Sequence, residues 1–251
     1  MIHFVGAGPG APDLITLRGA GLLERADQVI YAGSLVNPAL LERTKPGCAL
    51  HDSARLTLEQ VIDLMVRAEA AGLDTVRLHT GDSSLYGAVR EQFDALAARG
   101  IPYEVCPGVS AMSGAAAALG AEYTLPGISQ TVIVSRAPGR TPVPEKEALR
   151  GLAAHRATLV LFLSTGLTET LQSELLAGGY PPETPAAIVY KATWPEERVF
   201  RCTLSTLHAT AEAEGLTNTA LIVVGDCLGA AYDRSLLYHP GFTTGFREAS
   251  E

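Results

Sequence analysis

The sequence predicts an α/β protein with two domains, the first built on a mostly parallel sheet and the second on a mixed sheet, with an active-site cleft between them. Short strand-like runs alternate with helical patterns, an order that is typical of βαβ units. Loops containing Gly or Pro separate most of these segments. The length of 251 residues is sufficient for one large or two small domains, since domains usually have about 100–200 residues.

The expected strands are short runs rich in strand-forming residues. They are residues 2–6, 28–32, 75–79, 103–106, 131–135, 158–163, 186–191, 199–203 and 219–225. Helical patterns lie between most of them. The clearest helix begins after Thr57, whose hydroxyl can cap it while Gln60 reaches back, and it is expected to end at Gly72. Two further helices are expected over residues 84–99 and 110–119.

A cluster of breaker residues marks the expected domain boundary. Residues 120–130 contain the sequence YTLPG and separate an Ala-rich helical pattern from the next strand. The sequence therefore predicts an N-terminal α/β domain over residues 1–119 and a C-terminal α/β domain over residues 120–251. In the second domain the loop over residues 192–198 has no room for a helix, so the strands on either side of it are expected to pair antiparallel.

Composition and charge restrict the class of partner. The chain is 47% hydrophobic and only 18% charged, against a usual charged share of about 25%, which indicates a compact globular protein. Its net charge of −8 argues against nucleic acid, whose affinity for proteins comes from clustered positive charge. No apolar run approaches the about 18 residues of a membrane span, and the first residues lack the pattern of a signal peptide. A cytoplasmic protein is expected.

The four cysteines indicate neither a disulfide framework nor a metal site. They are scattered without a CxxC pair, each in or beside an apolar segment: Cys48, Cys106, Cys202 and Cys227. Cysteines in such surroundings usually behave as small buried hydrophobes. No metal site is expected.

Gly and Pro gather after three of the expected strands, in loops over residues 6–13, 79–87 and 107–111. The first loop has the G-x-G-x-x-G/A spacing of a dinucleotide-binding turn. However, Pro9 and Pro12 remove amide donors that a pyrophosphate needs, and no acidic residue follows the second strand, which argues against a nicotinamide oxidoreductase. Each loop alone is typical of a tight turn, but three at the carboxyl ends of parallel strands indicate one ligand with many backbone contacts.

Several motifs together resemble the tetrapyrrole methylases, which depend on S-adenosylmethionine. The resemblance runs from residue 2 to about residue 228 and rests on GAGPG with DLITL, ADQVIY, GD with YG, and PGVS, at residues 6–17, 26–31, 81–87 and 107–110. Further segments are most similar to the members that methylate carbon 11 in cobalamin synthesis: YAGSL, HTGD, YGAVREQ, TLP, SQT, RTP and ATWP. The chain departs from many members in having Thr80 and Ser83 around Gly81-Asp82, and Leu163 where several have Met.

The resemblance implies methyl transfer from S-adenosylmethionine to carbon 11 of precorrin-4, or of its cobalt form, to give precorrin-5. It also implies a small-molecule tetrapyrrole as partner and a homodimer. The acceptor carbon of this electron-rich macrocycle is already nucleophilic and has no proton to lose, so no strong general base is required and no catalytic side chain is assigned. Positioning of methyl and carbon is expected to dominate, which can remove about 7–11 kcal/mol of barrier.

The motifs also imply site residues. Those expected to contact the cofactor are Pro9, Thr80, Gly81, Asp82, Leu85, Tyr86, Ser110, Ala111, Leu163, Ala187, Thr219 and Ala220. Asp82 either accepts a hydrogen bond from the cofactor or caps a helix beginning near Ser84, and His79 is expected to be a strand residue with local hydrogen bonds. The carboxylate arms of a tetrapyrrole suit basic side chains in loops, and the candidates are Arg18, Arg136, Arg140, Lys191 and Arg198.

Three alternatives stay open at this point. An enzyme of the same fold acting on another corrin position is the first. A relative with a non-tetrapyrrole substrate such as ribosomal RNA is the second, although the net charge of −8 disfavours RNA. The third is a sensor that binds S-adenosylmethionine or a nucleotide without catalysis.

Overall fold

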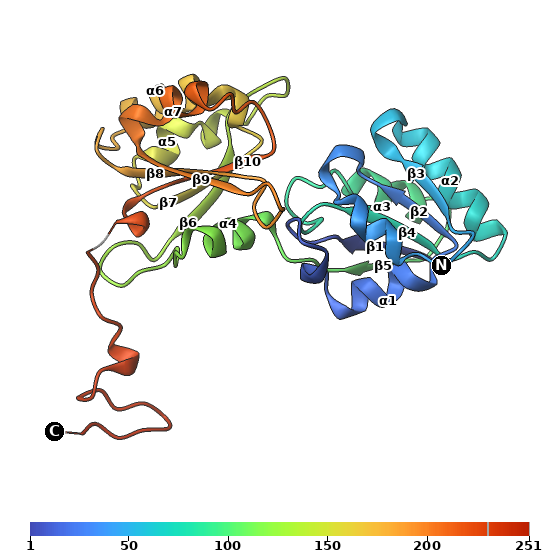
Figure 1. Ribbon diagram of the computed structural model, residues 1–251, viewed down its shortest axis with the longest axis horizontal. Helices are drawn as coiled ribbons and strands as arrows, with labels where there is room; N and C mark the ends of the chain where they lie inside the picture. Colours follow the sequence, from blue (N-terminus) through green and yellow to red (C-terminus); the bar gives the residue numbers. More distant parts are fainter. Residues whose placement is uncertain (230, 251) are drawn as a thin grey trace. The chain divides into compact units, whose positions relative to one another are not determined.

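The computed structural model describes residues 1–229 and 231–250, apart from the side chain of Ser34. The chain folds as two compact units, each with one five-stranded sheet (Figure 1). Unit 1 comprises Met1–Ala115 and Lys191–Glu197, and unit 2 comprises Ala116–Tyr190 and Arg198–Glu251. The domain boundary expected after residue 119 stays a prediction.

The sheet of unit 1 is entirely parallel, with the strand order β3-β2-β4-β1-β5. Its strands are β1 (Ile2–Gly6), β2 (Gln28–Tyr31), β3 (Ala49–Asp52), β4 (Thr75–His79) and β5 (Tyr103–Cys106). Every one of them except β3 was expected from the sequence. The edge strand β3 was missed because it follows the turn residues Pro46-Gly47 and has no fully buried residue, so its sequence shows no buried apolar run.

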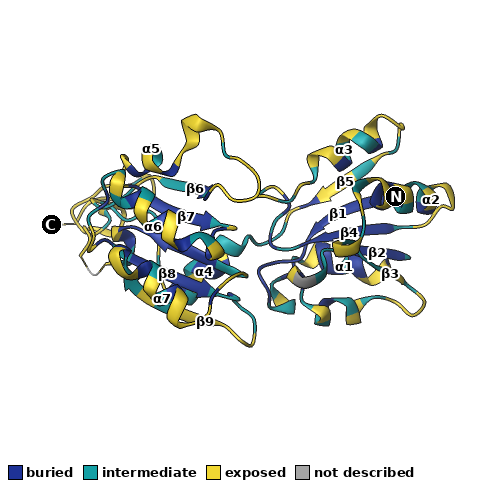
Figure 2. Cartoon of the chain, turned by 90° about the horizontal axis from the view of Figure 1, so that it is seen from above, coloured by how far each residue is buried: buried dark blue, intermediate teal, exposed yellow. Residues whose placement is uncertain are grey.

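The core of unit 1 lies on both faces of this sheet. One cluster of buried side chains includes Val5 of β1 and Leu23 of helix α1 (Leu17–Arg25). The other includes Phe4 of β1 and Met65 of helix α2 (Leu58–Ala70). Strands β1 and β4 are buried along their whole length (Figure 2), so their polar residues His3, Thr75, Arg77 and His79 are buried together with the apolar ones.

Two of the expected helix signals have different outcomes. The capping box of α2 is confirmed, since the Thr57 hydroxyl accepts from the Gln60 amide and the Gln60 side chain accepts from the Thr57 amide. The helix expected over residues 84–99 is wrong in its first part, because α3 spans only Arg90–Ala97. Tyr86 and Ala88 have φ values of 55° and 48°, in the left-handed region that an α-helix excludes.

Unit 2 contains the mixed sheet that the sequence predicts, with the order β6-β7-β10-β8-β9. Its strands are β6 (Val132–Arg136), β7 (Thr158–Phe162), β8 (Pro185–Tyr190), β9 (Arg198–Thr203) and β10 (Ala220–Val224). Strands β6 and β7 are parallel, whereas β7, β10, β8 and β9 pair antiparallel in turn. The antiparallel pairing of β8 with β9 confirms the expectation from the short loop between them.

The helices of unit 2 cover one face of its sheet (Figure 1). They are α5 (Leu149–Ala153), α6 (Thr168–Ala177) and α7 (Leu207–Ala213), and their buried side chains form one cluster with β7, β8 and β10. Helix α4 (Ala111–Leu119) occupies the segment expected to be helical over residues 110–119. No helix among the described residues is long and apolar enough to cross a membrane.

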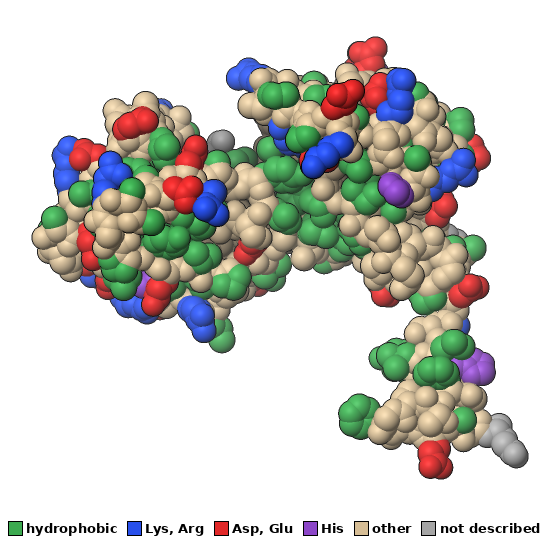
Figure 3. Space-filling view, turned by 180° about the vertical axis from the view of Figure 1, so that it is seen from behind, with side chains coloured by type: hydrophobic (Ala, Val, Ile, Leu, Met, Phe, Trp, Pro, Cys, Tyr) green, Lys and Arg blue, Asp and Glu red, His purple; other side chains and the backbone are tan. Residues whose placement is uncertain are grey.

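Short 3-10 turns complete the structure. They are Pro12–Leu14, Gly33–Leu35, Pro38–Arg43, Ser53–Arg55, Glu145–Glu147, Thr165–Leu167, Leu204–Thr206, Asp226–Leu228 and Leu236–Tyr238. The last of them belongs to a C-terminal segment, described over residues 231–250, that carries many exposed apolar side chains, drawn in green on the segment at lower right in Figure 3.

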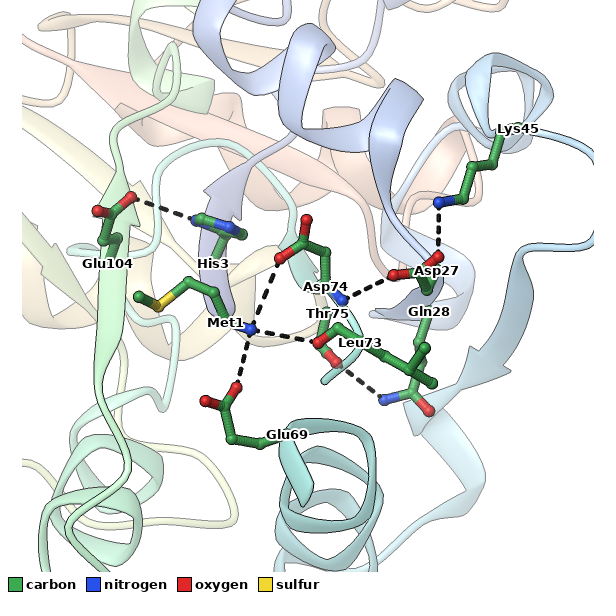
Figure 4. A network of polar contacts seen from close by, with 10 residues as sticks. All are labelled: Met1, His3, Asp27, Gln28, Lys45, Glu69, Leu73, Asp74, Thr75 and Glu104. Carbon is green, nitrogen blue, oxygen red and sulfur yellow. Dashed lines mark hydrogen bonds and ion pairs between the residues drawn. The ribbon is translucent and has the colours of Figure 1, made fainter. Parts of the chain in front are cut away.

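The amino ends of the strands in unit 1 are joined by a network of polar contacts (Figure 4). The amino group of Met1 lies 2.8 Å from a carboxylate oxygen of Glu69. Hydrogen bonds from Lys45 and from the Asp74 amide hold the pKa of Asp27 below its usual value. Ion pairs and hydrogen bonds thus join the polar groups at this end of the sheet, while the glycine loops lie at the carboxyl ends.

Candidate active site

The three glycine loops meet because β4, β1 and β5 are neighbours in the sheet of unit 1. The loop after β1 and the loop after β4 pair directly through an antiparallel bridge between Gly8 and Gly81. The Gly81 amide donates to the Gly8 carbonyl at 2.8 Å, and the Gly8 amide donates to the Gly81 carbonyl at 3.2 Å. The backbones of the first two loops are thus fixed against each other at the edge where open parallel sheets bind ligands.

The third loop approaches so closely that only glycine fits. A Cβ atom on Gly108 would lie 2.2 Å from the carbonyl oxygen of Gly81, and one on Gly6 would lie 2.5 Å from Cα of Gly108. All of these neighbours are backbone atoms, which cannot rotate away as a side chain can. The three loops can therefore adopt this arrangement only if Gly6 and Gly108 carry no side chain.

Asp82 joins the second loop to the third. Its Oδ2 atom accepts a hydrogen bond from the Gly108 amide at 2.7 Å, while Oδ1 accepts from the amide and hydroxyl of Ser84. Burial raises the pKa of the Asp82 carboxyl, but these hydrogen bonds outweigh it and hold the pKa below its usual value. The interpretation of Asp82 as a helix cap is wrong, since no helix begins at Ser84. It acts as an ionised link between loops.

Residues beyond Asp82 have a strained backbone. Tyr86 and Ala88 occupy the left-handed region, and a Cβ atom on the intervening Gly87 would lie 2.3 Å from the carbonyl oxygen of Ser83. Non-glycine residues in this region cluster at ligand sites, where surrounding structure holds them in place. The Tyr86 side chain is 43% exposed. The strain and the exposed ring mark this turn as part of the candidate site.

Sequence reasoning missed the residues that hold the first loop. Asn37 donates to the Gly10 carbonyl at 2.9 Å, Thr193 accepts from the Ala11 amide at 2.9 Å, and the indole of Trp194 donates to the Pro9 carbonyl at 3.2 Å. Trp194 is the only tryptophan of the chain and stands in the ATWP motif. No local signal connects it with a loop about 180 residues earlier.

Strand β4 contains two buried basic residues, Arg77 and His79, just before the second loop begins. Arg77 donates to the Gln92 side chain at 3.1 Å and to the Ile30 carbonyl at 3.2 Å, and burial lowers its pKa to about 10. Burial, together with the charge of Arg77, lowers the pKa of His79 to about 3. The expectation of local hydrogen bonds fails at Nε2 of His79, which is buried and has no partner among the described residues. His79 is therefore a neutral imidazole at physiological pH.

The residues expected to contact a cofactor fall into two groups. Those in unit 1 lie on the second and third loops, on the first loop, or at the start of α4: Pro9, Thr80, Gly81, Asp82, Leu85, Tyr86, Ser110 and Ala111. The structure brings these together around the Gly8–Gly81 bridge and the Asp82 link.

The second group lies in unit 2. Leu163 follows β7, and Thr219 and Ala220 stand at the start of the antiparallel neighbour β10, so the three share one end of the sheet. Leu163 and Thr219 both have a φ of 53°, and the Leu163 side chain is 66% exposed. Ala187 differs, because it is fully buried within β8 opposite Val223. The end of the sheet with two strained residues is the part of unit 2 that has the features of a ligand site.

Among the basic candidates, Arg136 shapes a loop. It stands at the end of β6, and its guanidinium donates to the carbonyls of Thr141 at 3.2 Å and Pro142 at 2.7 Å. These bonds fold the chain over residues 137–144 back onto the strand end. Arg140 lies in this loop and is exposed. The loop thus presents Arg140, while Arg136 holds the loop.

The other basic candidates lie elsewhere. Arg18 is exposed on α1. Lys191 pairs with Glu196 at 3.5 Å, and Arg198 pairs with Glu214 at 3.4 Å. Both of these ion pairs are on the surface and therefore weak, so another anion can replace the glutamate partner of either basic residue.

Comparison with known proteins adds the family context. The sequence profile of the Tetrapyrrole (Corrin/Porphyrin) Methylases matches residues 1–208. The chain is 48% identical to the cobalt-precorrin-4 C(11)-methyltransferase of Methanocaldococcus jannaschii over 249 residues, which are 99% of this chain and 96% of that relative. It is also 48% identical to the precorrin-4 C(11)-methyltransferase of Mycobacterium tuberculosis over 239 residues, covering 94% and 95% of the two chains.

Solved structures give the same picture. A cobalt precorrin-4 methyltransferase of cobalamin biosynthesis superposes with a TM-score of 0.89 at 44% identity, over 91% of this chain and 96% of that one. The uroporphyrin-III C-methyltransferase of Thermus thermophilus, solved in complex with S-adenosylhomocysteine, superposes with a TM-score of 0.74 at 29% identity, over 90% of this chain and 98% of that one.

Proposed function

The chain belongs to the tetrapyrrole (corrin/porphyrin) methylases, and we infer from this membership and from its relatives that it is a C-methyltransferase of cobalamin synthesis. It transfers a methyl group to carbon 11 of precorrin-4 or of the cobalt form of that macrocycle. The observation that carries this conclusion is the 48% identity to methyltransferases of this named activity over nearly the whole chain.

We propose S-adenosylmethionine as the methyl donor, bound by the residues named above on the three glycine loops of unit 1. The contacts expected from the unit 2 residues Leu163, Ala187, Thr219 and Ala220 stay predictions. The complex of the Thermus relative with S-adenosylhomocysteine supports the donor. The residues present fit it: the loops bring backbone groups together without intervening side chains, and Thr80, Ser110 and Ala111 are partly exposed beside them. The Asp82 carboxylate adds an ionised acceptor at the junction of two loops.

The protein contributes mainly by positioning. When bound, S-adenosylmethionine supplies a methyl group on a positively charged sulfur, and the acceptor carbon of the macrocycle is already electron-rich. The chain has to hold the two in line and keep water away, which can remove about 7–11 kcal/mol of the barrier. The loops around Gly8, Gly81 and Gly108 suit this task because hydrogen bonds and close packing hold their backbones against one another.

Labelled methyl transfer tests the function directly. The pure protein is incubated with S-adenosylmethionine carrying a ¹³C methyl group, and with precorrin-4 or cobalt-precorrin-4 in parallel. NMR of the product should place the label on carbon 11. Label on another carbon would indicate a different corrin position, and binding without transfer would indicate a sensor. The comparison of the two macrocycles shows which form is the better substrate.

Arg140→Ala is expected to weaken binding of the tetrapyrrole but not of the cofactor. Arg140 is exposed in the loop that Arg136 holds, and a charged hydrogen bond to a carboxylate arm contributes about 1.5–3 kcal/mol. We expect the KM for the macrocycle to rise about tenfold or more. Arg99→Ala, which removes an exposed arginine of unit 1, is the control. An unchanged affinity for the macrocycle in calorimetry would contradict this role.

We also propose that the protein is a homodimer and acts in the cytoplasm. The four cysteines are free, which agrees with a reducing compartment. The dimer is supported by exposed apolar side chains of the C-terminal segment: Tyr232, Leu236, Leu237, Tyr238, Phe242 and Phe246. Its four aromatic residues are 41–103% exposed and offer about 500 Å², more than half of the about 800 Å² that one partner contributes to a standard interface.

Replacing Leu236, Tyr238 and Phe246 together by Ser is expected to convert the dimer into a monomer, because most of this apolar area is lost. Light scattering after size-exclusion chromatography measures the mass of both forms at micromolar concentration. Leu73→Ser, at a surface leucine that is 40% exposed in unit 1, is the control and should leave the dimer intact. A triple variant that stays dimeric would rule out this segment as the interface.

A further inference from the structure

The segment Lys191–Glu197 connects β8 to β9 of the second sheet, yet it packs as part of unit 1. It contains Trp194, the only tryptophan of the chain. Lys191 and Thr193 have φ values of 47° and 68°, so the turn that presents the indole uses two strained non-glycine residues. Such strain persists only where surrounding contacts hold it, and it is common at functional sites.

The contacts of this segment are made with the first glycine loop. The indole Nε1 of Trp194 donates to the Pro9 carbonyl at 3.2 Å, and the Thr193 hydroxyl accepts from the Ala11 amide at 2.9 Å. The residue between them, Gly10, has no room for a side chain, because a Cβ atom there would lie 2.0 Å from Cδ1 of Trp194. Three consecutive residues of the loop are thus fixed from one side.

The loop is also supported from its other neighbours. Asn37 donates to the Gly10 carbonyl at 2.9 Å. A Cβ atom on Gly114 of α4 would lie 2.8 Å from Cβ of Pro9 and 3.3 Å from Cγ2 of Thr193, so the helix packs against both. The first loop therefore lies in a cradle formed by α4, Asn37 and the indole.

The segment that carries the indole is rigid in itself. The Thr193 amide donates to a carboxylate oxygen of Glu197 at 2.6 Å, and the Trp194 amide donates to the Lys191 carbonyl at 3.0 Å. The Nζ atom of Lys191 lies 5.2 Å from the centroid of the Trp194 ring and 3.5 Å from Glu196. The ammonium group above the ring adds a cation–π attraction. The indole thus acts as a fixed support.

We propose that Trp194 is a positioning residue for the methyl donor, holding Pro9 and Gly10 in the conformation in which the first loop binds S-adenosylmethionine. This proposal rests on the proposed function, in which Pro9 contacts the donor. A glycine-rich loop loses much conformational freedom when it is ordered. Because the indole orders the loop beforehand, that cost is not subtracted from the affinity for the donor.

Trp194→Ala is expected to raise the Kd for S-adenosylhomocysteine about tenfold or more, because ordering of the loop then accompanies binding. The KM for S-adenosylmethionine should rise in parallel, with a much smaller change in the KM for the macrocycle. Trp194→Phe keeps a ring beside Gly10 and loses only the N–H donor, so it should recover most of the affinity. Pro195→Ala, at an exposed neighbour in the same segment, is the control and should bind as the wild type.

Fluorescence of the single tryptophan gives a second readout in the unaltered protein. Titration with S-adenosylhomocysteine should change the emission of Trp194 with the same Kd that calorimetry gives. If the wild type binds no S-adenosylhomocysteine, the proposed donor is wrong. If it binds while Trp194→Ala binds equally well, only the positioning role is overturned. Should Trp194→Ala fail to fold by circular dichroism, Trp194→Phe decides instead. A Kd for S-adenosylhomocysteine that is a few-fold above that of the wild type and of Pro195→Ala supports the role, because the hydrogen bond to the Pro9 carbonyl is lost. A Kd equal to that of the wild type overturns it.

Discussion

Gly108→Ala is expected to abolish binding of S-adenosylmethionine and to lower the free energy of unfolding of unit 1 by about 3 kcal/mol. The added Cβ atom would lie 2.2 Å from the Gly81 carbonyl oxygen, 2.7 Å from Cα of Gly6 and 2.9 Å from the Gly6 carbonyl carbon. None of these atoms can move alone. Gly6 ends a buried central strand, and Gly81 is bonded to Gly8 in both directions. The third loop must therefore shift away.

The same shift explains the loss of donor binding. The amide of Gly108 donates to Asp82 at 2.7 Å, so a displaced third loop breaks the link that holds the second loop and leaves an ionised carboxylate without that donor. Calorimetric titration with S-adenosylhomocysteine and urea unfolding measure the two effects. Gly21→Ala is the matched control, because the nearest atom that its Cβ would meet, apart from its chain neighbours and the backbone of helix α1 itself, is Nη1 of Arg25 at 4.0 Å. It should bind normally and gain up to about 1 kcal/mol of stability. Wild-type affinity in Gly108→Ala would contradict the requirement for close approach.

Most of the fold could be predicted because its signals are local. Strands β7 and β10 read as nearly continuous apolar runs, and the capping box of α2 lies within four residues of sequence, from Thr57 to Gln60. The edge strand β3 and the late start of α3 had no such signal. Left-handed conformations at Tyr86 and Ala88 depend on the surroundings and not on the residue type, since neither is a glycine.

The candidate site was predictable to the extent that it depends on glycine. The three loops and their convergence follow from strand order in a parallel sheet and from the Gly content of the loops. Contacts between distant segments were not predictable. The bond from Trp194 to Pro9 spans 185 positions and the bond from Gly108 to Asp82 spans 26, and neither sequence neighbourhood contains a sign of its partner. Such contacts decide how the loops are held, which composition and spacing do not reveal.

The protein is expected to lose stability steeply as the pH falls from about 6.5 towards 4.5, chiefly because of His79. Burial and the nearby charge of Arg77 lower the pKa of His79 in the folded protein to about 3, whereas the ordinary value is 6.5. Below pH 6.5 the unfolded chain therefore binds a proton that the folded protein does not bind. Each pH unit in this window lowers the free energy of unfolding by about 1.4 kcal/mol. The total loss between pH 6.5 and pH 4.5 is therefore about 2.7 kcal/mol.

Other titrating groups can be separated from His79. Burial also lowers the pKa of His3, despite the neighbouring Glu104, so this residue adds a loss of the same sign in the same window. Asp27 and Asp82 have pKa values below the ordinary 3.8, so the stability that they contribute is lost only at lower pH. A difference between two proteins that vary only at position 79 isolates the effect of His79 above pH 4.5.

His79→Leu provides that comparison, because the replacement cannot titrate and its neighbours include the apolar ring of Phe4. Urea unfolding at pH 7.5 and pH 4.5 measures the free energy of both proteins. The wild type should lose about 2.7 kcal/mol more than His79→Leu between the two pH values. At pH 7.5 the variant should be at least as stable as the wild type, because it removes a buried nitrogen without a partner among the described residues. The same replacement at the exposed His155 controls for the loss of an imidazole. Equal losses in wild type and His79→Leu would mean that His79 takes up its proton in the folded protein as readily as in the unfolded chain. The interpretation of His79 as a buried neutral imidazole would then be wrong.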